Sequence, residues 1–153
     1  MRVFNLFDDA TLAPDEQEPD GYRAPFARVG RELGAERLAA SVVLLHQGQA
    51  VCPYHYEHGE EEWLVVLSGT PTVRTPRGEE VLEAGDVMAF PRGPSGAHKI
   101  ANTAAEPARV LIVAEHTAIA ATTYEDSDKI GVIGSDGFLL FQRADAVDYW
   151  HGE

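Results

Sequence analysis

The side chains most able to do chemistry in this sequence are imidazoles and carboxylates gathered in two segments. They are His55, Glu57, His58 and Glu62 in residues 52–69, and His98 in residues 85–102. Imidazole nitrogens and carboxylate oxygens are common protein ligands of divalent transition metals. The two segments together therefore predict a metal site, although they do not specify a reaction.

The spacing within the first segment indicates which of these side chains could share a site. Successive side chains of a β-strand point to opposite faces, so His55 and Glu57 would project together. Tyr56 and His58 would then lie on the other face. Glu62 follows a turn and returns on a neighbouring strand, where it could meet the first pair. The histidine of the second segment would complete a set of donors that converge inside the fold.

Short apolar runs separated by turn signals surround these segments. The runs are residues 38–45, 63–67, 70–75, 79–83, 87–90, 97–102, 108–116 and 138–142. Such spacing predicts an all-β sandwich or barrel of short strands. The run at 38–45 is β-branched and continuously apolar, which is typical of a strand covered on both faces.

The chain length fits one domain with a core of its own. Residues 1–37 are rich in aspartate, glutamate and proline, and they predict an arm lying on the surface with a short strand near Val3 to Phe7. Residues 38–115 would form the core of the fold, and residues 116–153 a C-terminal extension of the same domain.

Charge and composition exclude several classes of function. Twelve basic against twenty-five acidic residues give a formal charge of −13, which repels nucleic acid and anionic lipid surfaces. We therefore expect neither as a partner. The acidic start of the chain lacks the pattern of a secretory signal, so we expect a cytoplasmic protein. The lone Cys52 excludes an intrachain disulfide.

The two segments resemble the paired motifs of the cupin superfamily. In the first motif, His55-x-Glu57 takes the place of H-x-H, and Glu62 and Gly69 follow. The second motif is matched by the residues Gly85-Asp86, Pro91-x-Gly93, His98 and Asn102. The resemblance covers residues 38–115 and implies a small single-domain cupin β-barrel of the double-stranded β-helix, or jelly-roll, type.

Three features depart from the family pattern. Glu57 stands where the family has its second histidine. The gap from Gly48 to His55 is one residue longer than usual, and four residues separate Gly93 from His98 where the family has two. We interpret the last difference as a longer turn at residues 94–96.

The resemblance implies a ligand set for one divalent transition metal ion. Carried over residue by residue, the ligands are His55, Glu57, Glu62 and His98. An alternative alignment on Tyr56-x-His58 makes His58 a ligand instead. This donor set suits Fe, Mn, Ni or Zn without distinguishing among them. Tyr54 and Tyr56 are expected to line the substrate site.

Two functions from different classes follow from the resemblance. The first is a metal-dependent oxygenase, decarboxylase or isomerase that acts on a small oxygen-bearing molecule. The second is a non-catalytic cupin that binds a small molecule as a sensor or carrier. We also expect a homodimer, because edge strands and the apolar faces at 42–45 and 63–67 need covering.

Overall fold

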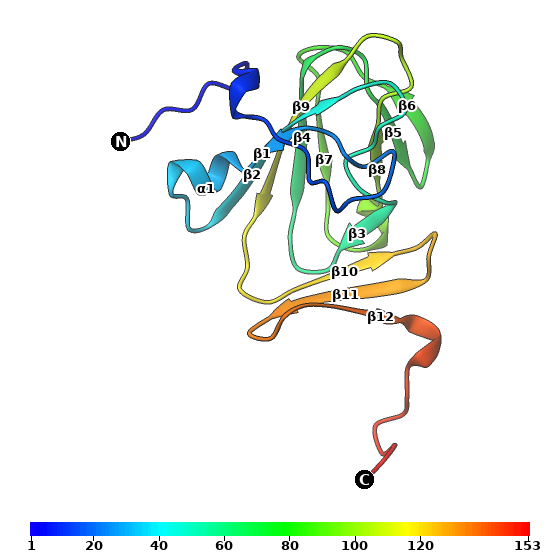
Figure 1. Cartoon of the computed structure of the whole chain (residues 1–153). Coiled ribbons are helices and arrows are strands. Elements are labelled where there is room, and N and C mark those ends of the chain that lie inside the picture. Colours follow the sequence, from blue (N-terminus) through cyan, green and yellow to red (C-terminus); the bar gives the residue numbers. More distant parts are fainter.

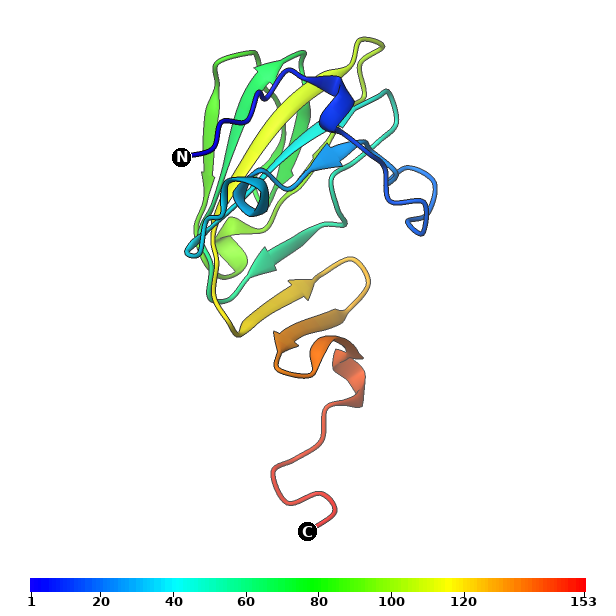
Figure 2. The ribbon, with the colours of Figure 1, turned by 60° about the vertical axis from the view of Figure 1, so that its left-hand side comes forward.

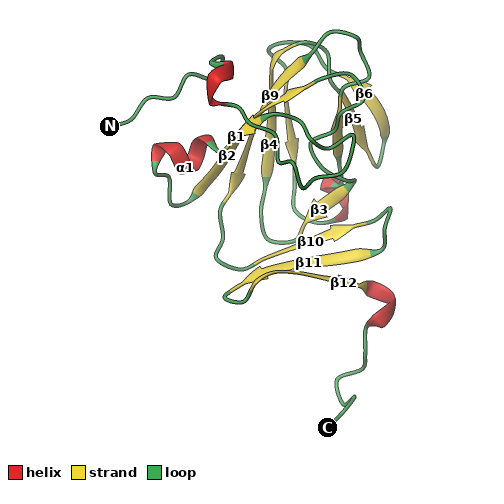
Figure 3. Ribbon diagram, in the orientation of Figure 1, coloured by secondary structure: helices red, strands yellow, loops and turns green.

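The computed structural model describes all residues, 1–153, and most of its regular structure is strand (Figure 3). The strands are β1 (Phe26–Ala27), β2 (Leu38–Leu45), β3 (His55–Glu57), β4 (Glu62–Ser68), β5 (Thr72–Thr75), β6 (Gly78–Val81), β7 (Val87–Phe90), β8 (Lys99–Ala101), β9 (Ala108–Glu115), β10 (Ala120–Tyr124), β11 (Lys129–Gly134) and β12 (Gly137–Gln142). The helical segments are α1 (Val29–Leu33) and the 3-10 turns η1 (Asp9–Thr11), η2 (Pro94–Gly96) and η3 (Arg143–Asp145). The all-β prediction is confirmed.

The strands form three antiparallel sheets (Figure 1). Their orders are β1-β2-β9-β4-β7, β12-β11-β10-β3 and β6-β5-β8. The hydrogen-bonded ladders do not close into one continuous barrel. The arrangement is instead a jelly-roll sandwich, in which strands distant in sequence are neighbours in space.

The main core lies between the five-stranded and the three-stranded sheet. Its eleven buried residues are Ala24, Val43, Leu45, Leu64, Val66, Val73, Leu82, Phe90, Ile100, Ala108 and Val110. These positions alternate along β2, β4 and β9, as expected when one face of each strand is buried. Burial of large apolar side chains stabilises the fold by roughly 1.5–3 kcal/mol each.

Strand β2 is covered on both faces, as its apolar sequence predicts. Val43 and Leu45 enter the main core, whereas Val42 is fully buried in a second cluster with Ala27 and Val29. Residues of the N-terminal arm, among them Phe4 and Leu6, pack against that second cluster. The arm therefore covers the outer face of the five-stranded sheet and is joined to it through β1.

The predicted strand near Val3 to Phe7 is wrong. The side chains of Asn5 and Asp8 accept hydrogen bonds from the backbone N–H groups two residues further on. Such local bonds favour turns over a sheet ladder. By contrast, the longer turn predicted before His98 is confirmed as the 3-10 turn η2.

The C-terminal extension contains more structure than the sequence predicts. Only the strand near 138–142 was expected, but β10 and β11 also form and join β12 to β3. Turned by 60°, the molecule still shows this sheet beyond the rest of the fold, with the tail after η3 running away from it (Figure 2). No helix is long and apolar enough to cross a membrane.

Candidate metal centre

Strand β3 positions the first two predicted donors. It pairs with β10 so that His55 lies opposite Tyr124 and Glu57 lies opposite Thr122. His55 and Glu57 therefore share one face of this sheet, as their spacing predicts.

The backbone ties His98 directly to His55. The N–H of each histidine donates to the carbonyl of the other, at 3.0 and 2.8 Å, which forms an isolated antiparallel bridge. The turn η2 delivers His98 to this place. Its residue Gly96 passes so close to Pro91 that an added Cβ would lie 1.7 Å from the Pro91 carbonyl oxygen. Only glycine fits there without moving the backbone.

Glu62 reaches the same place from another sheet. It is the first residue of β4 and lies between Phe90 of β7 and Ala114 of β9 in the ladder. One of its carboxylate oxygens, Oε2, lies 3.7 Å from His55 Nε2 and 3.5 Å from His98 Nε2. One donor atom from each of His55, Glu62 and His98 lies within 4.8 Å of the other two. The structure thus brings three of the four predicted ligands together.

Hydrogen bonds orient both imidazole rings toward Glu62. His55 Nδ1 lies 2.9 Å from the Pro53 carbonyl oxygen, and His98 Nδ1 lies 2.9 Å from that of Gly96. Because a carbonyl oxygen only accepts, each Nδ1 carries the proton and donates it. The Nε2 atoms are left facing the carboxylate. Hydrogen bonds of this kind are typical of metal-binding histidines. Phe90 stacks on the His98 ring at 3.6 Å between centroids and restricts it further.

The electrostatics of this cluster describe a site that attracts a positive charge. Glu62 Oε2 is buried and has no hydrogen-bond partner. Burial opposes ionisation of Glu62, but His55 and His98 outweigh it and hold the pKa of this carboxyl below its usual range. Burial also opposes the charged form of His55, but Cys52 and Glu62 raise its pKa to about 11. In the metal-free protein, a proton on His55 therefore occupies part of the space that a cation would take.

His98 offers a neutral nitrogen donor. Burial, together with the charge on His55, lowers the pKa of His98 to about 4. Its Nε2 lone pair is therefore available near neutral pH without the loss of a proton.

Glu57 stands beside this group without being part of it. Its Oε1 lies 3.8 Å from His55 Nε2, and the Thr122 hydroxyl lies 2.8 Å from each of its carboxylate oxygens. Burial raises the pKa of Glu57, the Thr122 hydroxyl opposes this effect, and the charge on Glu62 adds to it. The assignment of Glu57 as a fourth ligand stays a prediction.

The remaining predicted site residues are not among the three donors. His58 follows the end of β3, and its Nε2 lies 2.9 Å from the hydroxyl oxygen of Thr123, the residue opposite Tyr56. Tyr54 and Tyr56 are buried with Ala97 in a small apolar cluster. The alternative ligand His58 is thus not in the three-donor group.

Sequence reasoning missed three neighbours of the centre. Cys52 Sγ lies 3.4 Å from His55 Nδ1, the Tyr124 ring is 5.9 Å from the His55 ring, and Thr122 holds Glu57. Burial and nearby acidic groups raise the pKa of Tyr124 to about 12, so its hydroxyl keeps its proton at neutral pH. Tyr124 and Thr122 lie far along the chain, and only the pairing of β10 with β3 brings them here.

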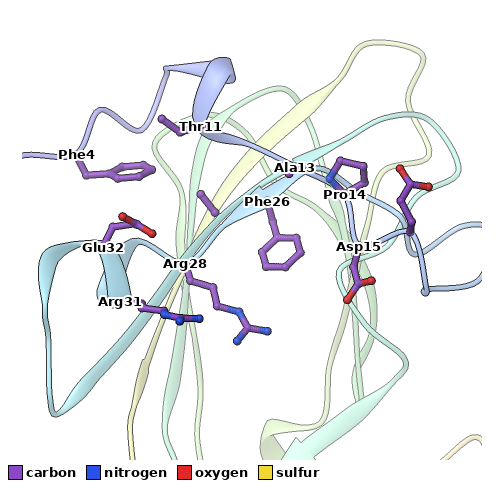
Figure 4. Close-up of a pocket in the computed structure, with 11 residues that line it drawn as sticks. Phe4, Thr11, Ala13, Pro14, Asp15, Phe26, Arg28, Arg31 and Glu32 are labelled. Atoms are coloured by element: carbon purple, nitrogen blue, oxygen red, sulfur yellow. The ribbon is translucent and has the colours of Figure 1, made fainter.

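A cavity of about 300 Å³ adjoins the centre through Glu62. Its other lining residues are Glu18, Tyr22, Ala24, Phe26, Arg28, Ser41, Val43, Val51 and Ile112. Two of them, Phe26 and Arg28, also line a larger surface pocket of about 910 Å³ under the N-terminal arm (Figure 4). The arm thus contributes side chains to the space beside the three-donor group.

The three donors fit a divalent transition metal. Ligands bound to one ion at about 2.0–2.2 Å lie roughly 3–4 Å from one another, and the separations of 3.5 and 3.7 Å fall in that range. A cation would also give the unpartnered Glu62 oxygen a favourable contact. His55, Glu62 and His98 could therefore hold a metal ion.

Comparisons with known proteins agree with this architecture. A family model described as "Cupin domain" matches residues 41–114, and no curated protein matches the chain. Among solved structures, the sugar phosphate isomerase from a cupin superfamily of Silicibacter pomeroyi superposes with a TM-score of 0.83 at 21% identity, covering 97% of this chain and 98% of that chain. The Cupin 2 conserved barrel domain protein of Salinispora arenicola gives a TM-score of 0.58 at 21% identity, covering 77% and 91%. The polyketide cyclase RemF of Streptomyces resistomycificus gives 0.61 at 22% identity, covering 75% and 79%. With its paired motifs, its jelly-roll fold and the family match at residues 41–114, the chain contains a cupin domain.

Proposed function

We propose that this protein is a metal-dependent isomerase of a small hydroxycarbonyl compound. The observation that carries the proposal is the position of Glu57. Its carboxylate is held by Thr122 and lies 3.8 Å from the imidazole nitrogen of a proposed metal ligand, yet outside the three-donor group. A carboxylate beside a Lewis-acid centre is the pairing that proton transfer next to a carbonyl requires.

In this proposal His55, Glu62 and His98 hold a divalent ion, which when bound polarises the substrate carbonyl as a Lewis acid. Glu57 accepts the proton from the hydroxyl-bearing carbon next to that carbonyl and returns it to the former carbonyl carbon, while the hydroxyl proton passes to the former carbonyl oxygen. Thr122 keeps the carboxylate in place, because its hydroxyl contacts both oxygens. The buried position of the cluster excludes bulk water and so limits loss of the abstracted proton.

Arg28 supports a substrate with an anionic end. It lines the cavity of about 300 Å³ with Glu62, the surface pocket of Figure 4, and a third pocket with Arg31 and His116. Neither arginine forms an ion pair, although the chain carries twenty-five acidic residues. Guanidinium groups bind phosphate and carboxylate well. A phosphorylated hydroxycarbonyl compound would fit this arrangement, and one structure of similar fold is described as a sugar phosphate isomerase.

The experiment is a deuterium-exchange assay of the metal-loaded protein. Aldose and ketose phosphates and their unphosphorylated forms are incubated in D₂O with protein loaded with Fe, Mn, Ni or Zn, and exchange next to the carbonyl is followed by NMR. Glu57→Gln should keep one ion per chain but slow exchange by about 10²–10⁴-fold, the usual contribution of a general base. Glu61→Gln, at an exposed neighbouring position, is the matched control.

A second arm of the same assay examines the anionic end of the substrate. Arg28→Ala should raise KM for phosphorylated compounds and leave KM for neutral compounds unchanged. Arg77→Ala, another exposed arginine without an ion pair, should change neither. Full exchange in Glu57→Gln would contradict the role of Glu57. Metal-loaded protein that binds a compound without exchange or turnover would favour the non-catalytic binding protein.

A further inference from the structure

The C-terminal sheet ends in a strand that has no partner on one side. Strand β12 pairs only with β11, so it is the edge of the order β12-β11-β10-β3. The backbone N–H and C=O groups on its outer side are therefore not in a ladder. Exposed edges of this kind readily pair with another chain, and proteins normally protect them with charges, prolines or bulges.

Strand β12 carries none of these protections. Its sequence, GFLLFQ at residues 137–142, contains no charged residue and no proline. Four consecutive large apolar side chains are about half exposed: Phe138 51%, Leu139 46%, Leu140 49% and Phe141 49%. Because side chains alternate along a strand, both faces of β12 present apolar surface. A strand that packs only within its own chain usually buries one face and has polar residues on the other.

The exposed apolar side chains of β12 and of the tail together have the area of one side of a dimer interface. At about 200 Å² per large side chain, the half-exposed side chains of β12 present on the order of 400 Å². Val147, Tyr149 and Trp150 of the tail, which extends away from β12, are 64%, 85% and 72% exposed. A second copy that covers the tail as well as β12 would bury on the order of 800 Å² of apolar surface. A stable interface of standard size buries about 800 Å² on each partner.

The composition of β12 indicates which partner pairs with it. We propose that β12 pairs with β12 of a second copy of this chain, antiparallel across a two-fold axis. The chain has a formal charge of −13, so two copies repel each other. This repulsion is weakest where a contact surface contains no acidic residue, as along β12. An uncharged strand with apolar residues on both faces is complementary to itself, as a two-fold interface requires. The chain's own tail runs away from β12 and leaves the edge free (Figures 1 and 2).

The proposed pairing joins the sheets that carry the two metal centres. In the ladder, Glu57 lies opposite Thr122, Thr122 opposite Gly131, and Gly131 opposite Leu140. Directly opposed residues lie on the same face of a sheet, so Leu140 continues the face that carries Glu57. Gly131 is buried beneath Phe138, whose ring would lie 2.7 Å from an added Cβ. Four strands from each copy would form one continuous sheet of eight.

The test is sedimentation equilibrium of the whole protein with substitutions on each face of β12. Wild type should have about twice the chain mass of 16.6 kDa. Leu140→Glu and Phe141→Glu should each weaken the dimer by at least about 100-fold, because a two-fold interface contains every substitution twice. Val81→Glu, on the edge strand β6 with its valine 63% exposed, is the matched control and should remain dimeric.

Amide hydrogen exchange on the wild-type protein gives a readout that does not depend on folding of a variant. Amides of residues 137–142 should exchange at least about 10-fold more slowly in the dimer than after dilution to monomer. Wild-type protein that is monomeric up to about 100 µM would overturn the proposal. A dimer that survives both glutamate substitutions, or that leaves exchange of β12 unchanged on dilution, would place the interface elsewhere and overturn it as well.

Discussion

Replacing Glu62 by glutamine should remove most of the thermal stabilisation that we expect from a bound metal ion. Glu62 Oε2 is the one buried side-chain polar atom without a hydrogen-bond partner, and it lies 3.5–3.7 Å from the Nε2 atoms of both histidines. The amide keeps the shape of the side chain but removes the charge and one anionic donor. Loss of a ligand should weaken metal binding by at least about 100-fold.

The expected shift in melting temperature follows from mass action. An ion present at about 100 times its Kd stabilises the wild type by about 2.7 kcal/mol, and the same concentration stabilises the variant by about 0.4 kcal/mol. For a chain of this length, each kcal/mol shifts Tm by about 2–4 °C. Wild type should therefore gain about 5–11 °C on addition of metal, and Glu62→Gln about 1–2 °C.

Differential scanning calorimetry with and without chelator measures this gain for each variant separately. The comparison cancels any change that the substitution makes to the metal-free protein. Glu61→Gln, the same chemical change one residue earlier at an exposed position, should keep the wild-type gain. If Glu62→Gln keeps it too, the three-donor site is not where the ion binds, and the reasoning fails.

Two further predictions concern pH and the buried amide of Asn102. Because the pKa of His55 is raised, protonation of His55 stabilises the metal-free protein fully at pH values below 6.5, the ordinary pKa of histidine. This contribution should disappear as the pH rises toward about 11. Since metal must displace the same proton, chelator competition should show affinity rising up to tenfold per pH unit near neutrality, and a constant Kd would contradict this. Asn102 is fully buried; it donates to the carbonyls of Leu45 and Glu106 and accepts from the Ala104 N–H. Asn102→Ala should lower the free energy of unfolding in urea by about 3 kcal/mol, and the exposed Asn5→Ala by at most about 0.5 kcal/mol. Equal losses in the two variants would refute the stabilising role of the buried amide.

Local periodicity predicted the elements that bury a clear apolar face. The run at 38–45 gave strand β2 with the expected bounds, and the alternation at His55 and Glu57 gave the shared face. Strands β10 and β11 escaped prediction because AATTY lacks large aliphatic residues and two glycines interrupt KIGVIG. Their stability comes from pairing with each other and with β3, which no local window contains.

The same limit applies to the candidate metal centre. Spacing and family resemblance identified His55, Glu62 and His98, because motif positions are local properties of the chain. They did not identify Thr122, which lies 65 residues from Glu57 and determines how its carboxylate is held. The choice between ligand and neighbour for such a side chain depends on tertiary contacts, which the sequence pattern does not contain.

The reciprocal bridge between His55 and His98 has a consequence for how an ion enters and leaves. The main chains of His55 and His98 are joined by two hydrogen bonds, so these two residues are held side by side whether or not an ion is present. Loading then requires no folding step, in contrast to zinc fingers, which are disordered without their metal. A chelator should therefore remove the ion and leave the polypeptide folded. Another suitable ion from the surroundings could then bind to the same donors.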